Sequence, residues 1–203
     1  MPKTVSSDLP SRAEEPFEGK PSSWHISVAA EAITAAQFAR CGFDVSVQYG
    51  ADQPEYDLIV AKGHRLLKVS VKGSQDWGWG LTQSYLAPAT KRSGKKADYH
   101  GAIDLWLERH GHRTVFCFVQ FGGVKPEQMP RLYLATPAEV AQRLRETSKG
   151  RGDSILYEHQ EWTMRAHGYG TVDAIPAAWN FSEQRIHELL TQSYSGLVVE
   201  GAS

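Results

Sequence analysis

The feature that most constrains this chain is a set of charged side chains inside apolar segments. Residues 25–41 have the composition of an alanine-rich helix, and Glu31 is the only charged residue in its interior. Two apolar, strand-like runs follow, with Asp57 in the first and Ser70 and Lys72 in the second. A charge at a position that a core would give to Leu or Val costs free energy unless a partner uses it. We therefore expect these side chains to carry chemistry.

Glu31 shares one side of its helix with apolar residues. At helical spacing its neighbours are Val28, Ala35 and Phe38. A Glu on the inner stripe of a helix needs a cation, a hydrogen-bond donor or a raised pKa. A Glu at the edge of the stripe would instead reach water, and the helix alone leaves that alternative open.

Strand-like runs lie between the helix and the middle of the chain. The first alternates apolar and polar residues, as a half-buried strand does, and the next two are mostly apolar. Residues 51–55 between them have turn composition. The three runs cover residues 43–49, 56–61 and 66–72.

The second and third runs predict a hairpin that brings polar groups together. If Gly63 and the residue after it form a two-residue loop, Lys62 faces Arg65. Asp57 then lies opposite Ser70, with Lys72 further along the same face and the valines of that strand on the other. A slip of one residue would separate these side chains, so the prediction depends on this register.

Such a cluster suits a divalent cation. The carboxylates of Glu31 and Asp57 are hard oxygen ligands that favour Mg²⁺ or Mn²⁺, and the backbone carbonyl of Val71 could be a third ligand. A metal ion there would stabilise charge on a phosphate and lower the pKa of bound water. Lys72 would contact the scissile phosphate or position the attacking water.

The order of these residues resembles the PD-(D/E)xK nuclease superfamily, which includes Holliday junction resolvases, repair nucleases and some homing endonucleases. Glu31 matches its helix acid, Asp57 its strand acid and Lys72 its motif lysine, and the resemblance covers about residues 24–121. It implies a restriction-endonuclease-like α/β (α+β) core, a central mixed sheet of about four or five strands flanked by helices. It also implies a metal-dependent endonuclease that hydrolyses nucleic-acid phosphodiester bonds, in DNA rather than RNA.

Two positions depart from the motif. Pro54 lies three residues before Asp57, whereas the superfamily's proline directly precedes the acid. Ser70 stands where an acid or a glutamine binds the metal, so only two carboxylates remain, unless Gln48 or Asp76 replaces the missing ligand. The alternative is therefore a catalytically degenerate module that binds nucleic acid or a protein partner, and an interaction protein unrelated to nucleases is a third class.

A glycine- and tryptophan-rich stretch follows Lys72. Residues 73–80 hold Trp77 and Trp79 among glycines, a composition that argues against a regular strand or helix. The two indoles could stack unpaired bases at the mouth of the site, with Ser74 and Gln48 nearby. They could instead fold back and seal the sheet.

A basic stretch predicts phosphate contacts. Its four cations would give salt-sensitive affinity without sequence information, although loop lysines also serve solubility alone. The net charge of −1 excludes a polycation that coats nucleic acid indiscriminately. The residues are Lys91, Arg92, Lys95 and Lys96.

The rest of the chain predicts one domain of 203 residues. We expect a flexible segment over 1–22, the nuclease-like core over 23–125 and a packed extension over 126–203. The extension holds a strand at 131–135, a helix that Thr136 caps and a final helix at 182–191.

Composition bears on the cellular setting. No apolar run approaches the 18 residues of a membrane span, and Cys41 and Cys117 lack CxxC spacing, so we expect a reduced, cytoplasmic protein. The pair His110 and His112 is more typical of a solvated loop than of a metal site. The sequence leaves a homodimer open.

Overall fold

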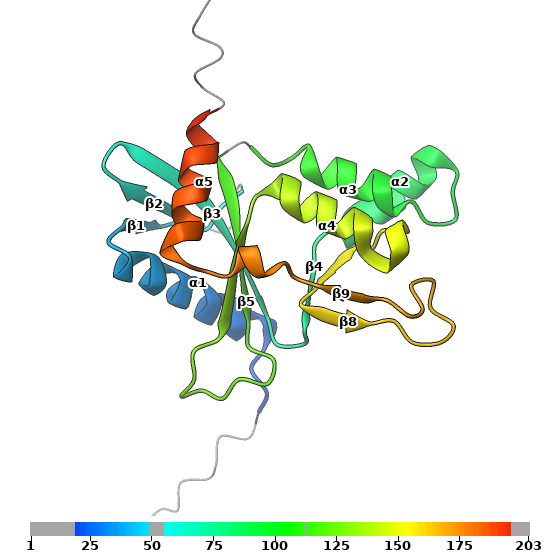
Figure 1. Ribbon diagram of the computed structural model, residues 1–203, viewed down its shortest axis with the longest axis horizontal. Coiled ribbons are helices and arrows are strands. Elements are labelled where there is room, and N and C mark those ends of the chain that lie inside the picture. The colour runs from blue at the N-terminus through cyan, green and yellow to red at the C-terminus, as the bar shows by residue number, and fades with distance from the viewer. Residues whose placement is uncertain (1–18, 49–54, 112, 196–203) are drawn as a thin grey trace, which may run out of the picture.

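The computed structural model describes residues 19–48, 55–111 and 113–195. Most of the predicted flexible segment, the turn at 51–54 and His112 lie outside these residues. In the described part, five strands form one mixed sheet in the order β1-β2-β3-β5-β6 (Figure 1). The pair β3·β5 is parallel, and the other neighbours are antiparallel. The strands are β1 (Asp44–Val47), β2 (Leu58–Lys62), β3 (Arg65–Ser74), β5 (Thr114–Gln120) and β6 (Arg131–Ala135).

Helices cover both faces of this sheet, which confirms the predicted α/β class (Figure 1). The helices α1 (Ser23–Arg40) and α5 (Glu183–Ser195) enclose one core with the valine-rich face of the sheet. The other face packs with α3 (Tyr99–Leu107), α4 (Pro137–Gly150) and the short helix η1 (Ala177–Trp179). None of the described helices combines the length and the apolar character that crossing a membrane requires.

The parallel pair puts two kinds of side chain on the two faces of the sheet. Val69 and Val71 of β3 belong to the core beneath α1 and α5. Ser70 is in register with Phe116 and Lys72 with Phe118, and both phenylalanines belong to the core on the other face. Because side chains alternate along a strand, Ser70 and Lys72 share that second face, as the sequence predicted.

Two helix starts follow directly from their sequences. Thr136 accepts a hydrogen bond from the backbone N–H of Glu139, whose carboxylate accepts from the backbone N–H of Thr136. This is the predicted capping box, with Pro137 in the first turn. Ser22 and His25 form an equivalent box at the start of α1.

Helix α2 (Gln83–Ser93) corrects the prediction of a loop around the basic stretch. Its sequence is polar and carries Pro88 in the interior, which removes a backbone donor and argues against a helix. Contacts with α3 stabilise it nonetheless. Lys91 and Arg92 therefore lie in the last turn of a helix, and Gly94 ends it with a left-handed backbone (φ 69°).

The glycine- and tryptophan-rich stretch also differs from its prediction. Gly78, Trp79 and Gly80 form strand β4 (Gly78–Gly80), which pairs with β7 (Ile155–Tyr157) from far along the chain. The prediction that this stretch forms no regular strand is therefore wrong. A second small sheet of β8 (His159–Glu161) and β9 (Val172–Ala174) was not predicted, because three-residue strands carry almost no periodicity.

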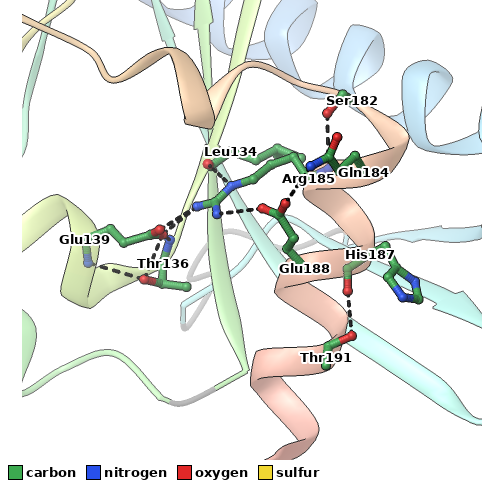
Figure 2. Close-up of polar contacts among 9 residues, drawn as sticks. All are labelled: Leu134, Thr136, Glu139, Ser182, Gln184, Arg185, His187, Glu188 and Thr191. Carbon is green, nitrogen blue, oxygen red and sulfur yellow. Dashed lines mark hydrogen bonds and ion pairs between the residues drawn. The ribbon is translucent and has the colours of Figure 1, made fainter.

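A buried arginine ties α5 to the rest of the domain (Figure 2). The Arg185 side chain is 5% exposed, and its Nε donates to the backbone carbonyl of Leu134 at 3.1 Å. One of its terminal nitrogens contacts both carboxylate oxygens of Glu139 at 2.7 and 2.6 Å. The other lies 3.5 Å from Glu188. One guanidinium thus links the end of β6, the start of α4 and α5.

Replacing Arg185 with Ala should lower the free energy of unfolding by about 3 kcal/mol, because it leaves a carboxylate and a buried carbonyl without their partner. Urea denaturation measures this loss. The matched control is Arg40→Ala, since Arg40 is exposed and bonds Gln37 on the surface; its effect should stay within about 0.5 kcal/mol. Equally small losses in both variants would contradict the role given to Arg185.

Candidate active site

The hairpin of β2 and β3 has the predicted register. Lys62 pairs with Arg65, and the ladder continues to Leu58 opposite Val69. Beyond that pair β2 ends, while β3 continues to Ser74, and among the described strands only β5 pairs with this part of it. The candidate site lies at this end of β3, beyond its pairing with β2.

Asp57 occupies the end of β2 and covers this free edge. Its backbone N–H donates to the carbonyl of Val69 at 2.8 Å, and its carboxylate accepts from the backbone N–H of Val71 at 2.5 Å. The side chain therefore replaces the next backbone acceptor of the ladder. The N–H and C=O of one strand residue lie on the same edge, so the Val71 carbonyl also points to the side where Asp57 lies.

Gly73 lets helix α1 approach the same part of β3. A Cβ at this position would come within 2.9 Å of both a side-chain atom and the carbonyl oxygen of Ile26, and 3.0 Å from the Cβ of Ala30. Such contacts are too short for any other residue without a shift of the helix. The glycine after Lys72 thus brings Glu31, next to Ala30 on α1, toward the edge of β3.

Glu31 lies at the border of the buried stripe of α1. The stripe consists of Ile26, Ala30, Thr34 and Phe38. Val28, which the sequence placed beside Glu31 on the inner face, is 46% exposed, so that part of the prediction is wrong. The Glu31 side chain itself is half-buried.

The charge of Glu31 interacts with two other predicted site residues. Burial raises the pKa of Glu31 most, the carboxylate of Asp57 raises it further and the ammonium of Lys72 lowers it. The charge of Glu31 is therefore within electrostatic range of Asp57 and Lys72. The convergence of the helix acid, the strand acid and the lysine stays a prediction, and Glu31 does not line the cavity that contains Asp57 and Lys72.

Ser70 and Lys72 line a cavity of about 340 Å³ together with Asp57. Ser70 is 4% exposed, whereas Lys72 is exposed. Residues from four further segments complete the lining, and none of them was predicted to belong to the site. They are Glu55, Tyr56, Gly80, Leu81, Ser84, Tyr85, Trp106, His110 and Phe116.

His110 is the least expected of these residues. Its ring packs against Trp106 and Phe116, with centroids 4.5 and 5.0 Å away, so its prediction as a solvated loop residue is wrong. Burial lowers the pKa of His110 most, Glu55 raises it, and Lys72 lowers it. Its Nδ1 is buried and has no hydrogen-bond partner among the described residues. No sequence signal connects it with the motif, because three separate elements meet here.

A second cavity of about 300 Å³ shares Lys72, Gly80 and Leu81 with the first. Ser74 and Asp76 line it, and the Ser74 hydroxyl donates to the Asp76 carboxylate at 2.7 Å. Asp76, one of the two replacement ligands considered from the sequence, is thus already engaged by a serine.

The other predicted nucleic-acid contacts have unequal surroundings. Trp79 is 3% exposed and packs against Phe118, as expected if it seals the sheet. Trp77 is 50% exposed and holds a left-handed backbone (φ 68°), with the guanidinium of Arg131 5.2 Å from its ring. Gln48 donates its backbone N–H to the carbonyl of Asp57 at 2.9 Å, which places it directly beside the site.

The basic stretch lies at the far end of α2. Ser84, near the start of this helix, lines the first cavity, and Lys91 follows about 10 Å further along the axis. Lys91, Arg92, Lys95 and Lys96 are all exposed. Lys95 also pairs with Asp98 at 3.3 Å. These cations can reach a long ligand, but they do not line the cavity.

Among residues 19–48, 55–111 and 113–195, no three His, Cys, Asp or Glu side chains gather as a metal-binding group. Comparison of the chain with protein-family models, curated proteins and solved structures finds no match. The functional argument therefore depends on the site alone.

The raised pKa of Glu31 predicts how its charge affects stability. The folded state holds this proton more tightly than the unfolded chain, so the contribution of Glu31 to stability is lost as pH rises through its raised pKa. Glu31→Gln should therefore unfold at a higher temperature than the parent at pH 8, and the difference should vanish below the ordinary value of 4.5. Thermal unfolding at both pH values measures this, and exposed Glu127→Gln is the control. A less stable Glu31→Gln at pH 8 would show that Lys72 outweighs burial.

Proposed function

We propose that the protein is a metal-dependent endonuclease that hydrolyses phosphodiester bonds of DNA. The observation that carries the proposal is that Asp57, whose carboxylate accepts from the backbone N–H of Val71, lines one cavity with Ser70 and Lys72, and the charge of Glu31 on α1 acts on both Asp57 and Lys72. Two carboxylates held close together repel each other unless a cation lies between them, and one lysine neutralises only one of the two charges. Such an arrangement costs stability and is typical of functional sites.

The donor set fits Mg²⁺ or Mn²⁺. Both ions favour oxygen ligands, and Mg²⁺ commonly keeps several waters while one or two carboxylates and the substrate phosphate complete its shell. Glu31, Asp57 and the carbonyl of Val71 would hold the ion. This set contains only oxygen donors, whereas zinc sites favour cysteine and histidine ligands. When bound, the ion supplies charge for the scissile phosphate and lowers the pKa of a water molecule.

The residues of the chain have separate roles in this proposal. Asp57 is fixed by the Val71 N–H, so its free oxygen keeps a constant position. Lys72 presents its ammonium to the same space and would contact the scissile phosphate, stabilising the negative charge that develops there. Ser70 offers a neutral hydroxyl at the third ligand position. The restriction-endonuclease-like fold is part of the same proposal.

A catalytically degenerate binding module is the second candidate, and Ser70 is the observation that favours it. The residue is almost fully buried, so its short hydroxyl cannot extend toward a metal as a Glu would. In that case the same surface would bind nucleic acid or a protein partner without hydrolysis. Titration with Mn²⁺ separates the two candidates, since a degenerate site shows no saturable binding that depends on Asp57.

The sharpest test of hydrolysis is Asp57→Asn. Asn keeps an oxygen that can accept from the Val71 N–H, whereas Ala would leave that buried donor unpaired and could disturb the edge. We expect Asp57→Asn to reduce Mg²⁺-dependent cleavage by at least about 100-fold. Incubation with supercoiled, linear, branched and single-stranded DNA measures the activity. The control is exposed Asp44→Asn on β1; equal cleavage by Asp57→Asn and the parent would refute the site assignment.

The basic end of α2 predicts a dependence on salt. Replacing Lys91 and Arg92 with Ala should weaken DNA binding for all sequences alike and reduce the slope of log K against log salt by about 2, one unit for each phosphate that the variant no longer neutralises. Fluorescence anisotropy between low and moderate salt measures the slope. An unchanged slope would mean that these cations only keep the surface hydrated, and Lys125→Ala on an exposed loop serves as control.

A further inference from the structure

The cavity that contains Asp57, Ser70 and Lys72 has aromatic walls. Trp106 and Phe116 form a buried floor, and their rings stack with centroids 5.3 Å apart. Above this floor stand three partly exposed rings that come from three different elements. They are Tyr56 before β2, Tyr85 in the first turns of α2 and His110 after α3.

Cations accompany the aromatic walls. The ammonium of Lys68 lies 4.9 Å from the Tyr56 ring, and the guanidinium of Arg109 lies 5.8 Å from the Tyr85 ring. Lys72 adds a third positive charge at the boundary with the second cavity. Aromatic faces next to cations suit a ligand that combines a flat ring with negatively charged groups.

The size of the cavity limits the ligand. At about 340 Å³ it lies at the small end of ligand pockets, so it takes one nucleotide and not a paired helix. A base inside a duplex is stacked and paired, and it must leave the stack before it can enter such a pocket. The polar edge of a base also needs partners, and the exposed Ser84 lines this cavity with a hydroxyl that can donate or accept.

We propose that this pocket receives one unpaired DNA base beside the scissile phosphate, so that the substrate is a single strand, a flap or another unpaired segment. The inference depends on the proposed function for the identity of the ligand as DNA and for the place of the phosphate. Tyr56 and Tyr85 stack on the base, and the hydroxyl of Ser84 contacts its edge. The rim cations Lys68, Arg109 and Lys72 face the phosphates on either side.

The test uses a single-stranded DNA oligonucleotide that carries one 2-aminopurine, and the same oligonucleotide as a duplex, both without divalent metal to prevent cleavage. The full chain should quench the 2-aminopurine of the single strand and bind it at least tenfold more tightly than the duplex by anisotropy. Tyr85→Ala should lose about tenfold in affinity for the single strand and most of the quenching. Tyr85→Phe, which keeps the ring, should behave as the parent does, and duplex binding should be the same for all variants.

Two controls separate stacking from folding. Tyr169→Ala removes an exposed tyrosine away from the cavity and should change nothing. If Tyr85→Ala lowers the unfolding temperature, the pair Tyr56→Ala and Tyr56→Phe repeats the comparison from a different element. Equal affinity for single strand and duplex, or losses in Tyr→Ala that the Phe variants share, would overturn the inference. Tighter binding of the matching RNA strand would overturn the assignment to DNA.

Failure of this inference and failure of the proposed function are distinguishable. If no divalent metal supports cleavage but ring-dependent binding of single strands persists, the pocket stands and hydrolysis is refuted. If cleavage requires Asp57 but proceeds equally on duplex and single-stranded DNA, the proposal of hydrolysis stands and the proposal of a base pocket is refuted.

Discussion

Where β2 stops and β3 continues, the backbone of β3 needs a partner that none of the described strands supplies. An unpaired strand edge exposes donors and acceptors that other chains could join, and natural proteins cover such edges. Here a single carboxylate does so, because Asp57 accepts the N–H of Val71 at 2.5 Å. The bond fixes the acid in place and leaves the Val71 carbonyl on the same side. Every later feature of the candidate site is built around this short length of edge.

Helix α1 reaches that edge only because residue 73 is glycine. A Cβ at position 73 would collide with Ile26 and Ala30, so the glycine lets α1 pack closely on β3, and burial together with the charge of Asp57 raises the pKa of Glu31. A fold selected for stability alone would avoid this repulsion. The glycine and the two acids form one arrangement in which the backbone brings like charges together.

Local patterns predicted those parts of the molecule in which neighbours along the chain decide the structure. The capping residue Thr136, the Gly63 hairpin and the strand at 131–135 all behave as their sequences indicate. Helix α2 and strand β4 do not, because contacts with α3 and with the distant β7 outweigh the effects of Pro88 and of the glycines. The motif residues were predictable, since one helix and one hairpin carry all of them. The aromatic walls were not, since Tyr56, Tyr85 and His110 meet only in three dimensions.

Ser70 connects the charge of the site with its aromatic pocket. The charges of Glu31, Asp57 and Lys72 sum to one net negative charge. An acid at position 70 would make this two, and the added charge would be almost fully buried beside Phe116. Under the proposed function, a site with serine would hold a divalent ion less strongly by itself, and a substrate phosphate would complete the shell. Contacts that hold the DNA through an unpaired base would supply that phosphate at the right place. In the proposed function, a serine at position 70 and a pocket for an unpaired base are therefore compatible features of one site, which would assemble fully only when its substrate is bound.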